Sequence, residues 1–506
     1  MGLVYDGTVK TESDARLRRV ASIAVPLLFL LTLLSWSFAS PVGASPDDDF
    51  HLPSIWCGLG DRDGVCEDSG DPDTRVVPGP VVSAPCYAFH PDLSADCWNP
   101  TTVDMVEAVW MNARGLYPPV FYGVMSIFVG PDVSTSVIAM RVFNSVLAVS
   151  LLTAVFFALP RSTRPALVIS AVATSVPLGL FIFASTNPSS WALLSAATVW
   201  ISLYGSTRTK GRRQIILAGL AVLATLIGAG ARADAGVFAV FGVLLAAVLT
   251  VRRGRPPLVP TIAAGVIVII SAAFYLTSGQ GGVLASGLPN QNPPLSGSQH
   301  LSNLLELPQL FLGAFGSTGL GWLDTQLPAT VHVLGFGVFC AAIFIGIHRL
   351  STRRAIALAM AGAAMWAVPL VLLAQSRSLV GATVQSRYVL PLLIMLVAVA
   401  SLSPRILRAW RGPRSLVAAL ALSFAMSLAL HDNIRRYTVG QDSNALDPGA
   451  GAEWWWSAGP SPLVVWLIGS AAFAAALALL WFVLRGLDDR TQSFEPARGG
   501  AVHTSL

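Results

Sequence analysis

The sequence predicts an all-α membrane protein that crosses the bilayer many times. Of its 506 residues, 54% are hydrophobic and 12% are charged, and the mean hydropathy is +0.65. Soluble domains carry about 25% charged residues, so this chain has too few to cover a soluble surface. Apolar runs recur between residues 20 and 484. The composition therefore excludes an ordinary soluble protein, and it excludes a disordered chain, which needs low hydrophobicity and high charge.

The apolar runs have the length of membrane-spanning helices, which need roughly 17–25 mostly apolar residues. We expect about twelve such helices, within a range of 11–13. The first run is rather long for a cleaved signal peptide, so we treat it as a helix. The expected spans are residues 20–40, 133–159, 165–184, 188–206, 214–230, 235–251, 258–277, 328–348, 355–374, 387–403, 414–431 and 462–484.

The charged residues alternate between successive connections. Most of the 32 Lys and Arg residues fall in every second connection, and most of the 27 Asp and Glu residues fall in the others. Basic loops stay in the cytoplasm, so residues 1–19 and a disordered tail, 485–506, are both predicted to be cytoplasmic. Residues 20–484 then form a single transmembrane domain, which includes a long extracytoplasmic loop over residues 41–132.

Four of the five cysteines lie in that loop, at Cys57, Cys66, Cys86 and Cys97. Four cysteines in one exported loop favour two disulfides in an oxidising compartment. Three connectivities are possible, of which Cys57–Cys66 with Cys86–Cys97 is the most local. A zinc site is the alternative, but the spacings are wide and no Cys-x-x-Cys occurs.

Residues 102–116 of the same loop carry apolar side chains at helical spacing. These are Val103, Val106, Val109 and Trp110. The spacing predicts an amphipathic helix lying on the membrane surface.

The loop opens with three adjacent carboxylates, Asp47, Asp48 and Asp49, followed by His51. A positioned carboxylate acts as a general base toward a hydroxyl, and a pair of them suits a divalent cation. His51 would orient an aspartate, bind a metal or simply pack. The plainer interpretation is that Asp47 or Asp48 caps a helix that begins near Phe50, and the triplet alone favours it.

Three arginines stand near helix ends on the outer face: Arg232, Arg377 and Arg387. The guanidinium group matches phosphate with a fork of donors. The alternative for each is an ion pair, with Asp234 for example, or a position among lipid headgroups. Together with a carboxylate on the same face, the arginines indicate a phosphate-bearing lipid substrate.

The sequence lacks the motifs that are typical of several functional classes. The sequence contains no Gly-x-x-x-x-Gly-Lys-Ser/Thr loop and no plausible dinucleotide site. No chain of acids and bases runs through the expected helix centres, where Arg141 stands alone. These observations weaken an ATP-driven pump and a proton-coupled carrier, and we expect no nucleic-acid partner.

Three short motifs occur in order on the outer face. They are Pro-Asp-Asp-Asp-Phe-His at 46–51, Asn-Pro-Ser-Ser at 187–190 and Gln-Ser-Arg-Tyr-Val-Leu-Pro at 385–391. With the long first loop, they resemble the membrane glycosyltransferases of the GT-C superfamily. The closer resemblance, over about residues 20–484, is to a bacterial family of predicted integral membrane proteins of unknown function. That family carries a Pro-Asp-Glu-x-x-His-like motif after its first helix.

The resemblance implies roles for individual residues. Asp47 would be the base that deprotonates the acceptor, and Asp48 would assist it or share a divalent cation with it. Arg387 and Arg232 would hold the donor phosphate. The same implied substrate site takes in His51, Asn187, Arg377 and Tyr388, although Asn187 before Pro188 fits a helix cap equally well.

The chain departs from the family pattern at three positions. Asp48 replaces the usual Glu, Asp49 stands where Pro is common, and Ser386 replaces Gly. A carboxylate pair remains, but the departures leave open which acid does what.

The resemblance implies a glycosyltransferase in the bacterial plasma membrane. It would move a hexose or pentose from a polyprenyl-phosphate donor to a cell-envelope glycan, lipid or protein on the extracytoplasmic face. Two alternatives stay open: a transporter or flippase of a lipid-linked glycan, and a non-catalytic membrane protein of envelope assembly.

Overall fold

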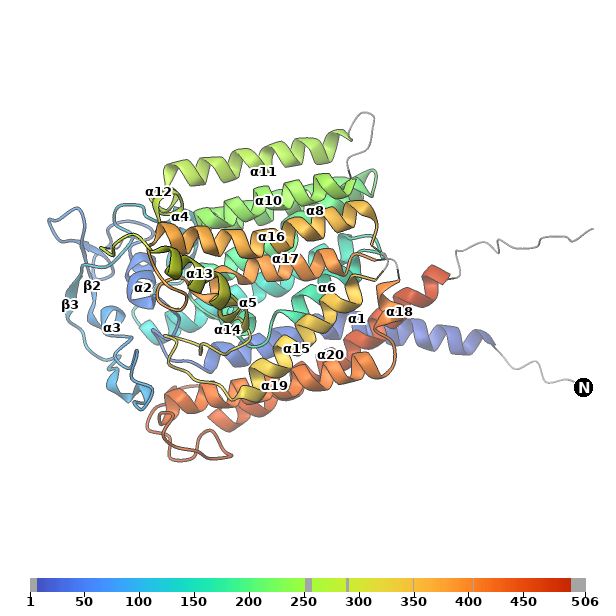
Figure 1. Cartoon of the computed structure of the whole chain (residues 1–506). Helices are drawn as coiled ribbons and strands as arrows, with labels where there is room; N and C mark the ends of the chain where they lie inside the picture. Colours follow the sequence, from blue (N-terminus) through green and yellow to red (C-terminus); the bar gives the residue numbers. More distant parts are fainter. Residues whose placement is uncertain (1–6, 251–256, 288–290, 349, 404, 493–506) are drawn as a thin grey trace, which may run out of the picture.

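A computed structural model shows a bundle of long helices with a small irregular cap at one end (Figure 1). We call the end with the cap the loop end. The opposite end, where α8 gives way to Arg208 and α16 begins beside Arg353, is called the arginine-rich end. The structure describes residues 7–250, 257–287, 291–348, 350–403 and 405–492.

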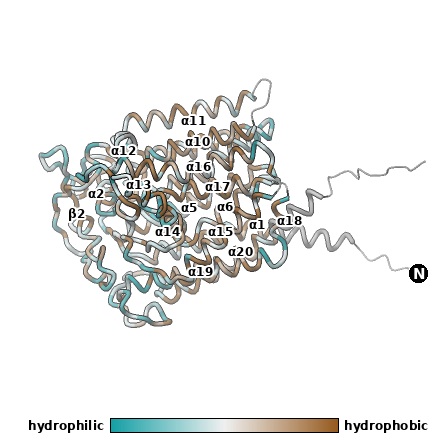
Figure 2. Tube along the Cα trace, viewed as in Figure 1, coloured by the Kyte–Doolittle hydropathy of each residue, from teal (hydrophilic) through white to brown (hydrophobic). Residues whose placement is uncertain are grey.

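Nine helices within these residues are long and apolar enough to span a membrane. Large apolar side chains are exposed along them, such as Leu276, Phe344 and Leu420, which suits contact with lipid. Figure 2 shows apolar residues along the bundle and polar residues gathered at the loop end. The prediction of a helical membrane protein with several spans is confirmed. The nine are α1 (Gly7–Phe38), α5 (Val133–Ala158), α9 (Arg212–Ala231), α10 (Ala233–Thr250), α11 (Leu258–Thr277), α15 (Ala329–Gly346), α16 (Thr352–Gln375), α19 (Pro413–Thr438) and α20 (Pro462–Gln492).

The other three expected spans take different forms. Helix α8 (Ser189–Thr207) is almost wholly buried among its neighbours, so it meets protein rather than lipid and tolerates many hydroxyl side chains. The segment 165–184 forms two short helices, α6 (Arg164–Ala173) and α7 (Leu178–Phe183). Pro177, just before α7, lacks the N–H that a continuous helix would need there. Helix α17 (Leu390–Ala400) is short and fully buried.

The helices at the two ends of the chain reach further than expected. Helix α1 starts at Gly7, well before the expected span. Helix α20 continues to Gln492, so the prediction of a disordered tail is wrong for residues 485–492. The remainder of the predicted tail, 493–506, and residues 1–6 lie outside the described residues.

The cap is built mainly from the long loop after α1. Its three strands form an antiparallel sheet in the order β1-β2-β3, in which Val76 pairs with Glu107. The structure contains the two local disulfides, Cys57–Cys66 and Cys86–Cys97, as predicted. The elements are α2 (Asp48–Trp56), β1 (Glu67–Asp68), β2 (Arg75–Pro78), α3 (Gly79–Val82), η1 (Ala95–Cys97), β3 (Met105–Ala108) and α4 (Pro119–Ser126).

The amphipathic helix expected at 102–116 is wrong, because this segment holds strand β3. Met105 to Ala108 pair with β2, and the valines that suggested a helix are β-branched residues that suit a strand. Val103, Val109 and Trp110 flank the strand and are exposed.

An amphipathic helix does occur at the loop end, but in α13 (Gly297–Glu306). Ser296 and Gln299 form a capping box at its start. Leu301, Leu304 and Leu305 share one exposed face, while the buried Asn303 donates to the Ser378 carbonyl. Short helices α12 (Gln280–Ser286) and α14 (Pro308–Gly313) flank it.

Arg141 fastens the end of α1 to α5. Its guanidinium donates to the carbonyls of Ser37, Ser40 and Pro41, at N···O distances of 3.1, 2.5 and 2.6 Å. The last carbonyls of a helix lack partners within the helix. Arg141 thus has a structural role, because it donates to the carbonyls at the end of α1.

A second buried arginine fastens the cap to α19. Arg436 pairs with Asp324 at 2.8 Å and donates to the carbonyls of Tyr87, His90 and Leu93. The contact brings together α19, the loop before α15 and the loop closed by Cys86–Cys97. Both charged side chains are buried, so each depends on the other for compensation.

This ion pair yields a prediction. Replacing Asp324 by Asn removes the charge that compensates Arg436, and breaking a buried pair in this way costs about 3–5 kcal/mol. We expect Asp324→Asn to lower the thermal unfolding midpoint of the detergent-solubilised protein by several degrees. The matched control is Asp73→Asn, which breaks an exposed pair with Arg114 and should leave the midpoint nearly unchanged. Equal midpoints in the two variants would contradict this role.

Candidate functional site

Three segments far apart in the sequence meet at the loop end. They are the turn before α2, the hairpin between α9 and α10, and the 3-10 helix η2 (Ser386–Tyr388) that leads into α17. Each contributes one charged residue of the predicted site: Asp47, Arg232 and Arg387. Arg387 forms an ion pair with Asp47 through its Nη2 atom, and Arg232 lies near enough to influence the charge of Asp47.

The backbone at Asp47 aims its side chain at Arg387. Its φ is +60°, in the left-handed region that Asp adopts more readily than most residues. Asp47 occupies the N-cap position of α2, yet its carboxylate makes no capping bond, and its carbonyl accepts from the N–H groups of Phe50 and His51. The interpretation of Asp47 as a capping side chain is therefore wrong, because its carboxylate is used elsewhere.

Asp48 points away from this pair into the protein. Its side chain is fully buried, and its carboxylate accepts from the Ser45 N–H at 3.0 Å and from the Thr186 hydroxyl at 2.9 Å. The structure thus gives Asp48 a positioning role rather than the predicted catalytic one. Thr186, which sequence reasoning missed, directly precedes the Asn-Pro-Ser-Ser motif.

Asn187 holds the same turn from the other side. Its amide donates to the Pro46 carbonyl at 2.7 Å, and its side-chain oxygen accepts from the Ser189 N–H at the start of α8. The side chain is fully buried, and its amide nitrogen is bonded to the turn. It therefore caps the start of α8, as the sequence allowed.

The pKa values of the two adjacent carboxylates are shifted in opposite directions. Burial raises the pKa of Asp48 to about 7, although Arg141 and the bond from Thr186 oppose it. Burial would raise the pKa of Asp47 as well, but nearby positive charge, that of Arg387 above all, outweighs burial and holds this pKa below its usual value. Asp47 is therefore ionised near neutral pH.

Arg387 is buried but incompletely paired. Its side chain is 3% exposed, and its Nη2 atom also donates to the Tyr388 hydroxyl at 3.1 Å. Its Nε and Nη1 atoms are buried without a hydrogen-bond partner. Its pKa lies above the usual value, since Asp47 outweighs the effect of burial. A permanent charge with two unused donors is suited to an anionic ligand.

Arg232 is neutralised by its neighbour. It binds Asp234 with two parallel hydrogen bonds of 2.9 and 2.7 Å, so the ion-pair alternative is confirmed for this arginine. Its guanidinium carbon lies 5.7 and 5.2 Å from the ring centroids of Tyr117 and Tyr388. Tyr117 joins the site from the cap, and nothing in its local sequence singled it out beyond an aromatic-rich segment.

His51 lies on the inner side of the site. Its Nδ1 atom is 2.9 Å from the Tyr122 hydroxyl, and its Nε2 atom is buried without a partner. Burial lowers the pKa of His51 to about 3, despite the opposing charge of Asp47. The imidazole is therefore neutral at physiological pH.

Arg377 does not take part in this cluster. It follows the end of α16 with a φ of +49° and donates to the Asn292 carbonyl at 3.1 Å. The prediction that it binds the same substrate as Arg387 finds no support in its contacts.

The described residues around Asp47 do not form a group of ligands for a divalent cation. Within the part of the chain that the structure describes, no three His, Cys, Asp or Glu side chains are grouped as metal ligands. The carboxylates of Asp47 and Asp48 face different partners, so they do not form the pair that was expected to share a cation.

Comparison with known proteins places the chain in a family. The family model described as "Predicted membrane protein (DUF2142)" matches residues 29–397. The chain belongs to this family. The DUF2142 match covers most of the chain and includes Asp47, Asn187, Arg232 and Arg387. No curated protein and no solved structure matches the chain.

The position of Asp48 yields a pH prediction. Between about pH 4 and pH 7, folded Asp48 keeps a proton that the unfolded chain has lost, so its contribution to stability falls as the pH rises. Asp48→Asn cannot ionise. We expect the unfolding midpoint of this variant, relative to wild type, to rise between pH 4 and pH 8 in a thermal-shift series. A difference independent of pH would show that folding does not raise the pKa of Asp48.

Proposed function

We propose that this DUF2142 protein is a glycosyltransferase that moves a sugar from a polyprenyl-phosphate donor to an envelope acceptor at the loop end. The observation that carries the proposal is the Asp47–Arg387 pair. The side chain of Asp47 is 38% exposed, whereas Arg387 is buried with two unused donors. The site therefore combines a reachable base with an anion-binding group.

These two groups match the needs of sugar transfer. The acceptor hydroxyl attacks the anomeric carbon and gives its proton to Asp47. The bond from that carbon to the phosphate oxygen breaks, and polyprenyl phosphate leaves. Negative charge grows on the phosphate during this step, so a fixed guanidinium beside it stabilises the transition state.

Donor binding would also adjust the base. In the free protein the charge of Arg387 holds down the pKa of Asp47, which makes the carboxylate a weak base. A phosphate on Nε and Nη1 would share that charge and weaken its effect on Asp47. Asp47 would thus become more basic when the donor is present.

The sugar chemistry and the lipid carrier are inferred from the GT-C-like motifs, and the outer location of the loop end from the basic residues at the other end. Two disulfides at the loop end support an oxidising compartment. The spanning helices place the chain in a bilayer, where a lipid-borne donor would be held.

Asp47→Asn tests the base. It removes the proton acceptor, and general-base catalysis contributes about 10²–10⁴-fold, so we expect transfer to fall below about one hundredth. The measurement is the profile of lipid-linked sugars and envelope glycans in a deletion strain that expresses each variant. Asp49→Asn is the matched control, since that carboxylate accepts from its neighbour Phe50 and not from Arg387. Normal glycans with Asp47→Asn would contradict the assignment.

Arg387→Gln tests the phosphate-binding role. Loss of a charge that acts in the transition state costs about 10²–10³-fold, and the unconsumed lipid-linked donor should accumulate in the strain. Arg377→Gln removes an arginine outside the cluster and should leave the glycan profile unchanged. Equal effects of the two substitutions would argue against a specific role for Arg387.

A further inference from the structure

Helix α13 presents an apolar face to the outside of the protein. Leu301, Leu304 and Leu305 are 55%, 41% and 70% exposed, and we call these three side chains the leucine face. Their spacing places them on one side of the helix. Gln299 and Glu306 are exposed on another side. The helix is therefore amphipathic with its apolar side turned away from the protein, which is the reverse of a helix that packs into a core.

Hydrogen bonds fix the orientation of this face. The amide of the buried Asn303 donates to the Ser378 carbonyl at 3.0 Å, and its side-chain oxygen accepts from the Val380 N–H at 3.0 Å. Both partners follow the end of the spanning helix α16, against which α13 packs. Turning α13 to bury its leucines would break both bonds, and an unpaired buried amide is costly. The leucine face therefore stays outside.

The segment α13–α14 lies alongside α16 (Figure 1). The ring of Phe311 in α14 contacts that of Trp366 in α16, with 6.0 Å between the centroids. Trp366 precedes the end of α16 at Gln375 by about 14 Å of helix. Val368 and Val371, in that part of α16, are also exposed. Helix α13 thus adds its leucines at a level of the bundle where apolar side chains of a spanning helix already face lipid.

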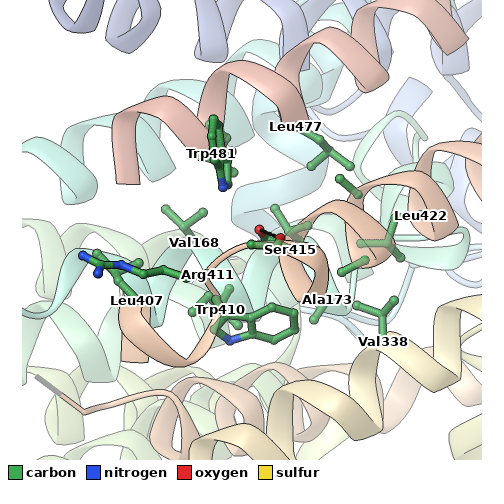
Figure 3. A pocket seen from close by; sticks show the side chains of 16 residues that line it. Val168, Ala173, Val338, Leu407, Trp410, Arg411, Ser415, Leu422, Leu477 and Trp481 are labelled. Atoms are coloured by element: carbon green, nitrogen blue, oxygen red, sulfur yellow. Dashed lines mark hydrogen bonds between the residues drawn. The ribbon is translucent and has the colours of Figure 1, made fainter. Parts of the chain in front are cut away.

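The leucine face does not line a ligand cavity. The cavity shown in Figure 3, of about 380 Å³, is lined by residues of α6, α15, α19 and α20, including Val338 and Leu422. Neither this cavity nor a second one of about 150 Å³ has a lining residue in α13. The occupant of the leucine face is therefore not a small molecule held in one of these two cavities.

We propose that α13 lies in the plane of the bilayer surface at the loop end, with the leucine face among the acyl chains. Gln299 and Glu306 then face water. Helix α13 contains no Lys or Arg, so burial of the leucines, and not attraction to anionic headgroups, drives the insertion. The inference does not depend on the proposed sugar transfer.

The inserted segment borders the candidate site. Gly313 in α14 lies directly against Ser386, because a Cβ atom at 313 would collide with the Ser386 hydroxyl. The Thr318 hydroxyl oxygen is 3.5 Å from the same hydroxyl oxygen. Ser386 directly precedes Arg387. Insertion of α13 would therefore anchor a segment that packs beside the Asp47–Arg387 pair.

Site-directed spin labelling of the full-length protein tests the position of α13. The label is attached to Leu305→Cys or Glu306→Cys in a Cys340→Ala background, because the other four cysteines are disulfide-bonded. The protein is placed in nanodiscs of phosphatidylcholine. We expect the label at 305 to be more accessible to oxygen, which concentrates among acyl chains, than to a water-soluble nickel chelate. The matched label at 306 should show the opposite preference.

A label on Leu420→Cys gives the reference for lipid contact, since Leu420 is 61% exposed on the spanning helix α19. A preference for nickel at 305 would show that the leucines face water and would overturn the inference. Low accessibility of 305 to both reagents would show that protein, such as a second copy of the chain, covers the leucine face, and would also overturn it.

The anchoring of α14 is tested by Leu301→Ser combined with Leu305→Ser. Loss of these side chains weakens insertion, so amide hydrogen exchange over residues 308–318 should rise severalfold in the same nanodiscs. The control pair, Leu416→Ser with Leu420→Ser, removes two exposed leucines from α19 and should leave exchange over 308–318 unchanged. Equal exchange in wild type and the α13 double variant would contradict the anchoring.

Discussion

The buried carboxylate of Asp48 fixes the geometry on which the candidate site depends. It holds the turn after α1 through the Ser45 N–H and the Thr186 hydroxyl, while Asn187 holds the Pro46 carbonyl. These bonds anchor the turn against the start of α8, and the left-handed backbone then directs Asp47 toward Arg387. Two adjacent aspartates thus divide the work: one is buried and positions the turn, and the other remains reachable.

The same division between structure and chemistry applies to the arginines. Arg141 binds carbonyls at the end of α1, and Arg436 binds Asp324 and carbonyls of the cap, which it holds against α19. Arg232 is neutralised by Asp234. Arg387 keeps two buried donors, Nε and Nη1, without a partner beside an ionised carboxylate, whereas Arg141 and Arg436 each leave only Nε without one.

Much of the fold follows from composition and periodicity alone, because a spanning helix must be long, apolar and internally hydrogen-bonded. The disulfide pairing was also within reach, since the local connectivity proved correct. Strand β3 was not predictable in this way: its valines suit either period, and pairing with β2 decides between them. Likewise, the break between α6 and α7 could not be predicted, because the sequence of this segment is one continuous apolar run.

For the site, sequence order brought Asp47, Arg387, Arg232, Tyr388 and His51 under consideration, and the structure places them together. The sequence alone could not separate the roles of Asp47 and Asp48. Their burial distinguishes them, and burial depends on tertiary packing. Thr186 and Tyr117 were missed for the same reason: neither has a local signal, and each acts on a residue more than 60 positions away in the chain.

The central claim is that Arg387 holds the phosphate of a lipid-linked sugar beside Asp47. The most direct test is an experimental structure of the Asp47→Asn protein with a non-hydrolysable polyprenyl phosphonate sugar. The account predicts the phosphonate within hydrogen-bond distance of Nε and Nη1 of Arg387, with the anomeric carbon facing residue 47. A phosphonate bound elsewhere, with Arg387 still unengaged, would contradict it.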